Sequence, residues 1–387
     1  MKNVIFADEM KRKILLIPVL LMAALRAEAQ EAQPSWLARM GLDYLHSLTA
    51  PKKSLDSVYV FQPTLKWTVS VESEILRIGA DLHSTFSVTD LTGDNPSITQ
   101  GTLDTGMKNL PYRKVGLAGG YGSLRLGFGV QLGKKSGKKN TYLSFGMTNP
   151  SYGARARYYK IHPYPEGTLV YGDGAPVSLA SEIPGEMRTL ALDAFYAFNR
   201  HRFVYTAVYD GRILQRRSAG SWLVAAKYLQ GDVSLGENDP LWARLNNQER
   251  YSTRQFSLGG GYSFNWVLFH QDPTEPSTAS GLRNLTLNAT LQCRLSFLNH
   301  VQTVQAAAAG GKTVRYTGQP ALAPAAQGGL CYSLGRCCFC ASVEYDYFGF
   351  QGIETDASAE NDHLRTRVRT EGTFYNLTVQ GKVSVRF

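Results

Sequence analysis

Four of the five cysteines lie close together, at Cys331, Cys337, Cys338 and Cys340. Clustered thiolates can bind zinc, but alternate residues of a strand point to opposite faces, so Cys337 would face away from Cys338 and Cys340. A two-residue turn before Cys337 would place Cys331 opposite Cys340 as a non-hydrogen-bonded pair, with Cα atoms about 4.5 Å apart. The sequence therefore offers Cys331–Cys340 as a candidate disulfide in an oxidising compartment. The alternative is that the cysteines are only small, semi-apolar strand residues.

The densest polar cluster contains Arg212, Arg216 and Arg217. A guanidinium group donates paired hydrogen bonds that suit a phosphate group, so these arginines are candidate contacts for an anion such as lipopolysaccharide or a phosphorylated substrate. Alternatively, they line a lumen or bend a strand.

Catalytic machinery is not indicated. The seven histidines stand outside the Gly-x-Ser-x-Gly and His-Glu-x-x-His patterns of serine hydrolases and zinc proteases. Asp81 and His83 would share one strand face, but this spacing is common by chance. We predict no catalytic residue, no metal ligand and no cofactor.

The elements that must position these residues are strands. From Leu285 to Phe297 the odd positions are apolar and the even positions are polar, and Asn376 to Phe387 alternates in the same way. Such alternation produces a strand with one apolar and one polar face. Weaker alternation marks residues 78–88, 124–130, 152–158, 190–198, 222–228, 256–268 and 337–348.

The strand lengths favour a membrane barrel over a soluble sandwich. Some strands reach 12 or more residues, and crossing a membrane takes about 9–11. Tight turns also alternate with connections of about 20 residues or more, as barrel topology requires. We predict an all-β fold, a single antiparallel transmembrane β-barrel of about 12 strands, within a range of about 10–14. A soluble periplasmic β-protein is the alternative.

Alternate positions of a strand point into the lumen and out of it, and the positions assigned to the lumen predict a net positive charge there. The expected lumenal bases outnumber the acids, which suits either an ion-pair network or an anion-leaning channel. The expected bases are Arg77, Arg125, Arg155, Arg157, Lys227, Arg294, Lys382 and Arg386, and the expected acids are Asp81, Asp193, Glu344 and Asp346.

Both ends of the chain carry export signals. Lys11-Arg12-Lys13 precedes an apolar run and Ala27-Glu28-Ala29, which predicts a signal peptide over residues 1–29. The last strand ends on Phe387, the position where bacterial outer-membrane barrels commonly carry an aromatic residue that the barrel-assembly machinery reads. We therefore expect a protein of the outer membrane, with a periplasmic segment over 30–56 that contains a short helix at 35–50, and a barrel over 57–387.

The formal net charge of +10 is spread along the chain without a basic block. Nucleic-acid binding is therefore not expected. For an exported protein, attraction to outer-membrane lipid and lipopolysaccharide is the expected consequence.

Residues 202–205 and 215–221, together with Pro111–Gly119 and Gly260–Phe264, resemble a Bacteroidetes family of outer-membrane β-barrels, the domain of unknown function 4421. The resemblance extends over about residues 57–387. It implies the fold and the location but no catalytic residues. We predict a non-enzymatic barrel acting as a narrow pore, an envelope structural protein or a surface-binding scaffold. A small barrel enzyme acting on lipid or lipopolysaccharide is the alternative.

Overall fold

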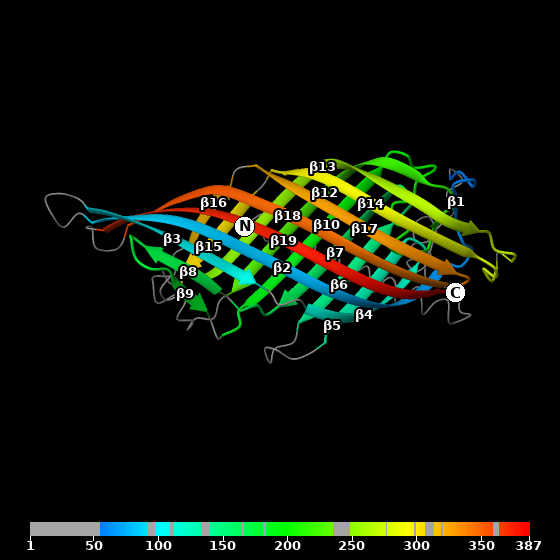
Figure 1. Cartoon of the computed structure of the whole chain (residues 1–387), viewed down its shortest axis with the longest axis horizontal. Coiled ribbons are helices and arrows are strands. Elements are labelled where there is room, and N and C mark those ends of the chain that lie inside the picture. The colour runs from blue at the N-terminus through cyan, green and yellow to red at the C-terminus, as the bar shows by residue number, and fades with distance from the viewer. Residues whose placement is uncertain are drawn as a thin grey trace, which may run out of the picture. The chain divides into compact units, whose positions relative to one another are not determined.

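A computed structural model of the chain describes most of the residues from 55 to 387 (Figure 1). The predicted signal peptide and the predicted helix at 35–50 lie outside the described residues. Among the described residues, no helix is long and apolar enough to cross a membrane. The described ranges are 55–90, 97–108, 112–132, 140–164, 166–180, 183–234, 248–275, 277–297, 299–305, 313–318, 320–358 and 364–387.

Twelve antiparallel strands form a closed ring, as predicted. Each strand pairs with its neighbour along the chain, and the ring closes where the last strand, β19, pairs with the first, β2. The ring consists of β2 (Trp67–Asp90), β4 (Tyr112–Tyr121), β5 (Leu124–Gln131), β6 (Thr141–Thr148), β7 (Tyr152–Ile161), β10 (Glu186–Ala197), β12 (Ala219–Ser234), β13 (Gln248–Gln271), β14 (Arg283–Ser296), β17 (Ala321–Leu334), β18 (Cys337–Ser358) and β19 (Leu364–Arg386).

The two ends of the barrel differ in their connections. At one end, which we call the turn end, the chain makes tight turns such as Gly335-Arg336, and β2 begins where β19 finishes. There Trp67 and Phe387 exchange two backbone hydrogen bonds of 2.9 and 3.2 Å, which fix the seam. At the opposite loop end, the strands continue into extra hairpins (Figure 1). These hairpins use β3 (Ser97–Lys108), β8 (Glu166–Tyr171), β9 (Val177–Ala180), β15 (Asn299–Gln305) and β16 (Thr313–Gly318).

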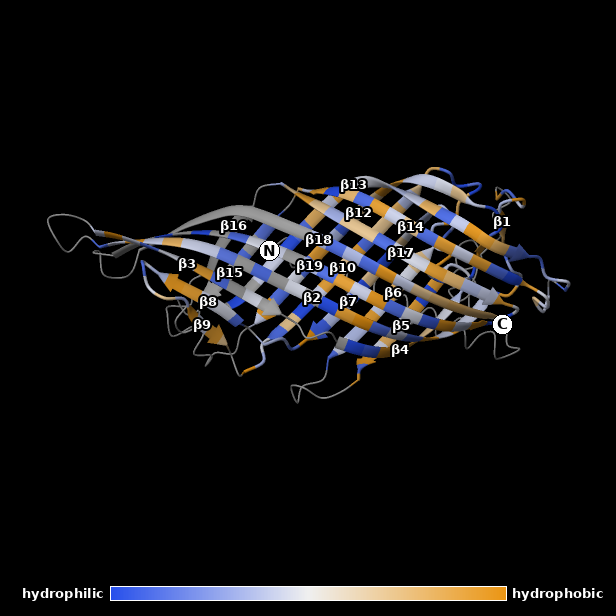
Figure 2. Ribbon diagram, viewed as in Figure 1, coloured by the Kyte–Doolittle hydropathy of each residue, from blue (hydrophilic) through white to orange (hydrophobic). Residues whose placement is uncertain are grey.

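Apolar and polar residues alternate along the strands (Figure 2), and exposure shows that the apolar ones face outward and the polar ones face the lumen. Along β14, the even positions Asn284 to Ser296 are buried in the lumen, except for the half-buried Gln292, whereas outward residues such as Leu291 are exposed. The outward apolar side chains form a continuous apolar belt around the wall. The belt includes Val69, Val71, Ile75, Leu117, Leu126, Phe128, Val130, Leu143, Trp222, Val224, Leu258, Leu287, Leu291, Leu330, Phe339, Val343, Val379 and Val383.

Two of the expected lumenal charges are on the other face. Arg77 and Asp81 are exposed on the outer side of β2, together with His83. The odd positions of β2 already face outward at Val69 and Val71, and the β2–β19 pairing runs through Arg77 without a register shift. The prediction was wrong because it took the apolar residues of 78–88 as the lipid-facing set, although β2 has left the apolar belt there.

One connection at the turn end is long and folds inward. Residues 199–218, which join β10 to β12 and which we call the plug, are largely buried inside the barrel. Within the plug, β11 (Leu214–Gln215) pairs with β1 (Val60–Phe61) from the segment before β2. The plug is therefore a long connection at the end of the barrel where the alternation of connections predicts a tight turn.

Candidate functional site: a plugged lumen

An apolar core holds the plug against the barrel wall. Phe203 is fully buried and packs with Tyr205 against Ala197 and Leu223 of the wall. Val204 is also fully buried and packs with Val60 of β1. Burial of an apolar side chain of this size contributes about 1.5–3 kcal/mol. The sequence therefore has a physical reason to fold this connection into the lumen.

Buried amides fix the backbone of the plug. Gln215 is fully buried. Its side-chain oxygen accepts a 3.0 Å hydrogen bond from the Val204 N–H, and its side-chain nitrogen donates to the carbonyl oxygen of Arg217 at 2.9 Å. From the wall, Asn265 donates to the Val204 carbonyl and Asn284 to the Gln215 carbonyl, both at 2.8 Å. The buried polar groups are thus paired, which gives the plug one defined position.

Two plug tyrosines reach strands further around the wall. The Tyr205 hydroxyl donates to Gln327 at 2.6 Å, and the Tyr209 hydroxyl donates to Asn288 at 2.5 Å. These hydrogen bonds connect the plug, which joins β10 to β12, with β14 and β17. The plug is therefore anchored on several strands.

Arg212 is the main ionic anchor of the plug. Its guanidinium donates to Asp210 at 2.6 Å, to the Thr148 hydroxyl at 2.8 Å and to the Leu124 carbonyl at 3.0 Å, and it also contacts the Gly122 carbonyl. Burial by itself would raise the pKa of Asp210, but the Arg212 guanidinium, its hydrogen bonds and nearby Lys382 lower that pKa well below its usual range. Asp210 is therefore ionised, and the ion pair ties the plug to the β4–β5 and β6–β7 turns.

The structure separates the three arginines predicted to contact an anion. Arg212 points into the lumen, whereas Arg216 pairs with Asp272 at 2.5 Å near the turn end, and Arg217 is exposed. An anion would have to compete with the protein partners of Arg212 and Arg216. Their contact with an anion stays a prediction.

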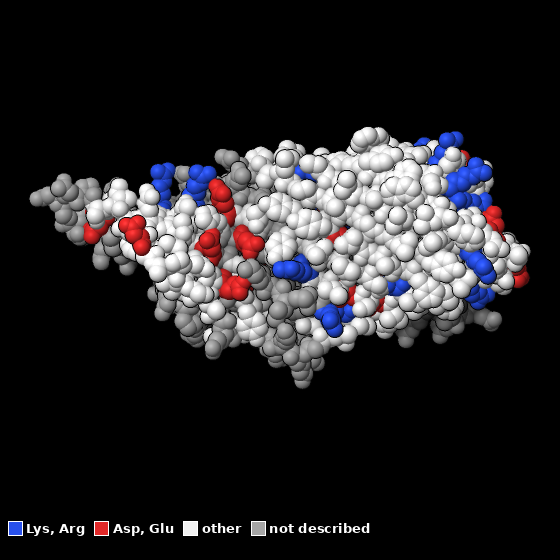
Figure 3. All heavy atoms as spheres, in the orientation of Figure 1, with Lys and Arg blue, Asp and Glu red and all other residues white. Residues whose placement is uncertain are grey.

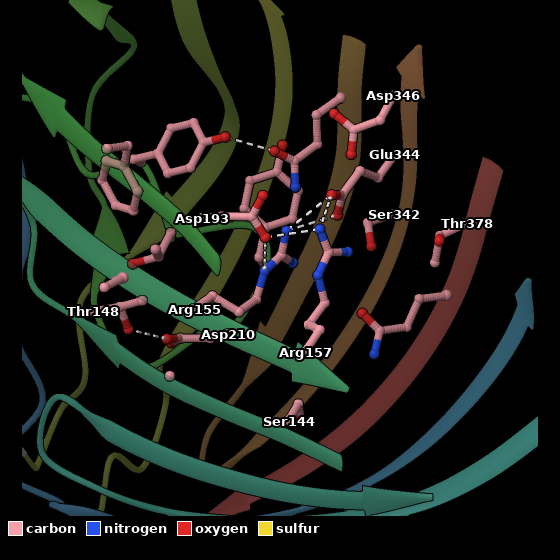
Figure 4. Close-up of a pocket in the computed structure, with 18 of the residues that line it drawn as sticks. Ser144, Thr148, Arg155, Arg157, Asp193, Asp210, Ser342, Glu344, Asp346 and Thr378 are labelled. Carbon is pink, nitrogen blue, oxygen red and sulfur yellow. Dashed lines mark hydrogen bonds and ion pairs between the residues drawn. The ribbon is translucent and has the colours of Figure 1, made fainter. Parts of the chain in front are cut away.

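Beyond the plug, the lumen contains a cavity of about 170 Å³. Tyr205, Tyr209 and Asp210 of the plug contribute to its lining, together with inward side chains of the wall (Figure 4). The cavity is smaller than the sites of about 300–1,000 Å³ that typically hold a drug-sized ligand. It can accommodate only a small molecule or ordered water.

Paired charges surround this cavity. Arg155 and Arg157 from β7 both donate to Glu344 of β18, at 2.9 and 2.8 Å, and Arg157 also donates to Asp193 of β10 at 2.8 Å (Figure 4). Lys227 of β12 and Arg294 of β14 both bind Asp346 of β18, at 2.6 and 2.5 Å. These bonds connect β7, β10, β12, β14 and β18 across the lumen.

A second group of lumenal charges includes the predicted Arg125 and three residues that were not predicted, Glu72, Glu74 and Lys114. Glu74 of β2 accepts a 2.6 Å hydrogen bond from Lys114 of β4, and Glu72 pairs with Arg125 of β5. A signal was available in the sequence, because Val69, Val71 and Ile75 alternate with Ser70, Glu72 and Glu74. With Arg77 and Asp81 removed and Glu72, Glu74 and Lys114 added, eight bases stand against five acids, so the lumenal charge remains net positive, as predicted.

The described lining of the cavity includes carboxylates, guanidinium groups and tyrosines but no histidine. Within the described part of the chain, no group of three or more His, Cys, Asp and Glu side chains could hold a metal ion. The predicted Asp81–His83 neighbours are not joined either, since His83 pairs with Asp104 of β3 on the outer surface. The arrangement fits structural ion pairing.

The cysteines lie where the β17–β18 hairpin meets the plug. The predicted register, with Leu334 opposite Cys337 and Cys331 opposite Cys340, is confirmed. The structure joins Cys331 to Cys340, with Cα atoms 4.0 Å apart. Gly211 of the plug has a positive φ of 67° and approaches so closely that a Cβ there would lie 3.0 Å from the Cys338 sulfur. Only glycine suits this contact.

The fold and the site define a twelve-stranded β-barrel protein, closed into a ring, whose lumen contains a plug formed by its own chain. A model of the family described as a domain of unknown function (DUF4421) matches residues 85–304, more than half of the chain and including the plug. The chain belongs to this family. No curated protein matches it.

Three solved structures illustrate what the chain is similar to. A bacterial polysaccharide outer membrane secretin gives a TM-score of 0.30 at 9% identity, with 80% of this chain and 98% of that chain covered. The beta domain of the Bordetella autotransporter BrkA gives 0.29 at 9% identity, covering 80% and 100%. The Pseudomonas putida toluene transporter TodX gives 0.26 at 8% identity, covering 83% and 90%.

Proposed function

We propose that this protein is a closed, non-enzymatic barrel of the bacterial outer membrane that serves as an envelope structural protein or a surface-binding scaffold. The observation that carries the proposal is the combination of an apolar exterior with a polar lumen that the plug fills at the turn end. Export through the predicted signal peptide and a Bacteroidetes origin belong to the same proposal.

The apolar belt supports the membrane location. Large side chains stand out from the wall, with exposed fractions of 64% for Leu117, 68% for Trp222 and 69% for Leu291. Water-soluble proteins rarely expose a continuous apolar surface of this size. In lipid, these side chains are in their preferred solvent, and the closed ring leaves no unpaired strand edge within the wall.

The orientation follows from the connections. Barrels of the outer membrane have short turns on the periplasmic side and long loops outside. The turn end, with Trp67 and Phe387, would face the periplasm, and the barrel-assembly machinery would read Phe387 there. The loop end, with its extra hairpins, would face the exterior and offer a surface for a binding partner.

The plug argues against an open pore, and the paired charges argue against an enzyme. Arg155, Arg157 and Arg294 are held by carboxylates, and the described lining of the cavity includes no histidine to act as a base. A lipid-modifying enzyme would need a reactive group that is not committed to such pairs.

Conductance measurements test the closed state. Wild-type protein in planar bilayers should show little current, whereas replacing residues 203–214 with a short Gly/Ser linker should open a channel. A matched control replaces residues 236–246, between β12 and β13 at the loop end, with the same linker. Heat-modifiable migration on gels would show that each variant still forms a barrel.

Three outcomes would refute the proposal. Equal conductance with and without the plug would exclude plugging, and recovery in the soluble periplasmic fraction would exclude the location. A change in the lipid or lipopolysaccharide mass spectrum of a deletion strain, reversed by the wild-type gene, would favour the enzyme.

A further inference from the structure

Two arginines on the outer surface of the barrel stand apart from the ion-pair networks. Arg77 of β2 and Arg113 of β4 are both exposed and both face outward. No described residue forms an ion pair or a hydrogen bond with either guanidinium group. Both guanidinium groups are therefore available to bind a partner outside the chain.

The strand register brings these two side chains together. Arg113 lies directly opposite Ile75, and Arg77 is the next outward residue after Ile75 on β2. Diagonal neighbours on one face of a sheet have Cβ atoms about 7–8 Å apart or somewhat less, within reach of long side chains. Two guanidinium groups can thus converge on one doubly charged group between β2 and β4.

The outward neighbours of Arg77 and Arg113 show where the pair lies along the barrel axis. Ile75, which lies opposite Arg113, and Leu117, which lies on the turn-end side of both arginines, belong to the apolar belt and are 42% and 64% exposed. Arg77 is the first charged outward residue of β2 beyond the belt, and the next charged outward position is Asp81, four residues further and roughly 13 Å away. Figure 3 shows a face of the barrel whose middle is mostly uncharged, with basic side chains gathered at the turn end and acidic side chains gathered towards the loop end. The pair therefore lies at the loop-end border of the belt.

Another basic pair on the outer surface is already bound by a carboxylate of the protein. Lys160 of β7 lies directly opposite Arg188 of β10, but both bind Glu186, at 3.0 and 2.5 Å. The protein itself neutralises that pair in part. Arg77 and Arg113 have no such carboxylate partner among the residues that the structure describes.

We propose that Arg77 and Arg113 form a binding site for the phosphate group of a lipid A-type lipid in the outer leaflet. The inference rests on the proposed function, because only an outer-membrane barrel with its loop end outside places this border at the headgroups of lipopolysaccharide. Guanidinium groups bind phosphate through charge-assisted, paired hydrogen bonds. A basic side chain near an anionic membrane surface contributes about 1 kcal/mol. Each arginine should therefore strengthen binding about fivefold and the pair about 25-fold.

The test uses the full-length protein in nanodiscs of zwitterionic phospholipid. Native mass spectrometry would count the bound molecules of diphosphoryl lipid A, monophosphoryl lipid A or phosphatidylglycerol as each is titrated in, with inorganic phosphate as a competitor. The variant R77Q/R113Q should bind both lipid A forms about 25-fold more weakly than the wild type. The matched control K160Q/R188Q, which removes the same charge from the same face, should bind them normally.

Several results would overturn the proposal. Unchanged binding by R77Q/R113Q, or an equal loss in K160Q/R188Q, would remove the site. Equally tight, arginine-dependent binding of phosphatidylglycerol would assign it to a general anionic phospholipid, and full competition by millimolar inorganic phosphate would assign it to a free anion. An epitope inserted between β18 and β19 tests the orientation separately. If antibodies cannot reach this epitope in intact cells, the proposed function fails. If they can reach it and lipid A binding is still unchanged in R77Q/R113Q, only the binding site fails.

Discussion

Replacing Arg212 with methionine should loosen the plug. Methionine keeps much of the length of the side chain but removes the donors that Arg212 directs at Asp210, Thr148 and Leu124. Asp210 would remain as a buried carboxylate, with only 8% of its side chain exposed. The Thr148 hydroxyl and the backbone N–H of residue 212 would still donate to it, at 3.2 and 2.9 Å.

The size of the effect follows from the burial of this pair. Removing one partner of a buried ion pair costs about 3–5 kcal/mol, because the other charge is left without compensation. Since two donors to Asp210 remain, we expect the lower value of about 3 kcal/mol, which corresponds to about a 150-fold increase in the ratio of open to closed plug. The double variant D210N/R212M should lose less than R212M, because no buried charge is left unpaired.

Hydrogen exchange of the plug peptide 203–214 in detergent or nanodiscs measures this opening directly. R216M is the matched control, because Arg216 binds Asp272, whose side chain is 58% exposed. A pair this exposed contributes about 0–1 kcal/mol. The reasoning would be refuted if the plug amides of R212M exchanged within about fivefold of the wild-type rate, or no faster than those of R216M.

Further predictions concern the cysteines, the C-terminus and pH. The peptide spanning Cys331 and Cys340 should resist alkylation until it is reduced, and free alkylation of both thiols before reduction would contradict the bond. Deleting Phe387 should lower the amount of assembled barrel, because Phe387 supplies both the aromatic side chain and the seam hydrogen bonds with Trp67; normal surface levels would contradict the assembly signal. Since the pKa of Asp210 is lowered in the closed state, its contribution to plug stability should be fully present above about pH 4, the usual Asp value, and lost as the pH falls further. Bilayer conductance should therefore stay low from pH 8 to 5 and rise only in stronger acid, and an opening centred near neutral pH would assign the control to another group.

The sequence alone determined the strands, the class of fold and the hairpin of the cysteines. Alternation of apolar and polar residues is a local property, so the β14 pattern from Leu285 to Phe297 could be assigned to two faces without knowing the neighbouring strands. The Cys331–Cys340 register followed in the same way, because a two-residue turn fixes the pairing of the strands beside it.

Only the tertiary structure decided which of two alternating faces is lumenal once a strand leaves the belt. Beyond the apolar belt both faces of a strand can carry polar residues. The alternation of β2 around Arg77 therefore no longer shows which face points into the lumen. The continuous pairing with β19 is what keeps Arg77 outside.

The tertiary structure also decided the fate of residues 199–218. Their sequence reads as an ordinary long loop, because Phe203, Val204 and Val208 have no strand or helix period. They become a plug only because the closed ring presents Asn265, Asn288 and Lys382 to them inside the lumen. Partners from strands far apart in the chain leave no local signal in the sequence. The plug could therefore be recognised only from the tertiary structure, in which the closed barrel brings these partners together.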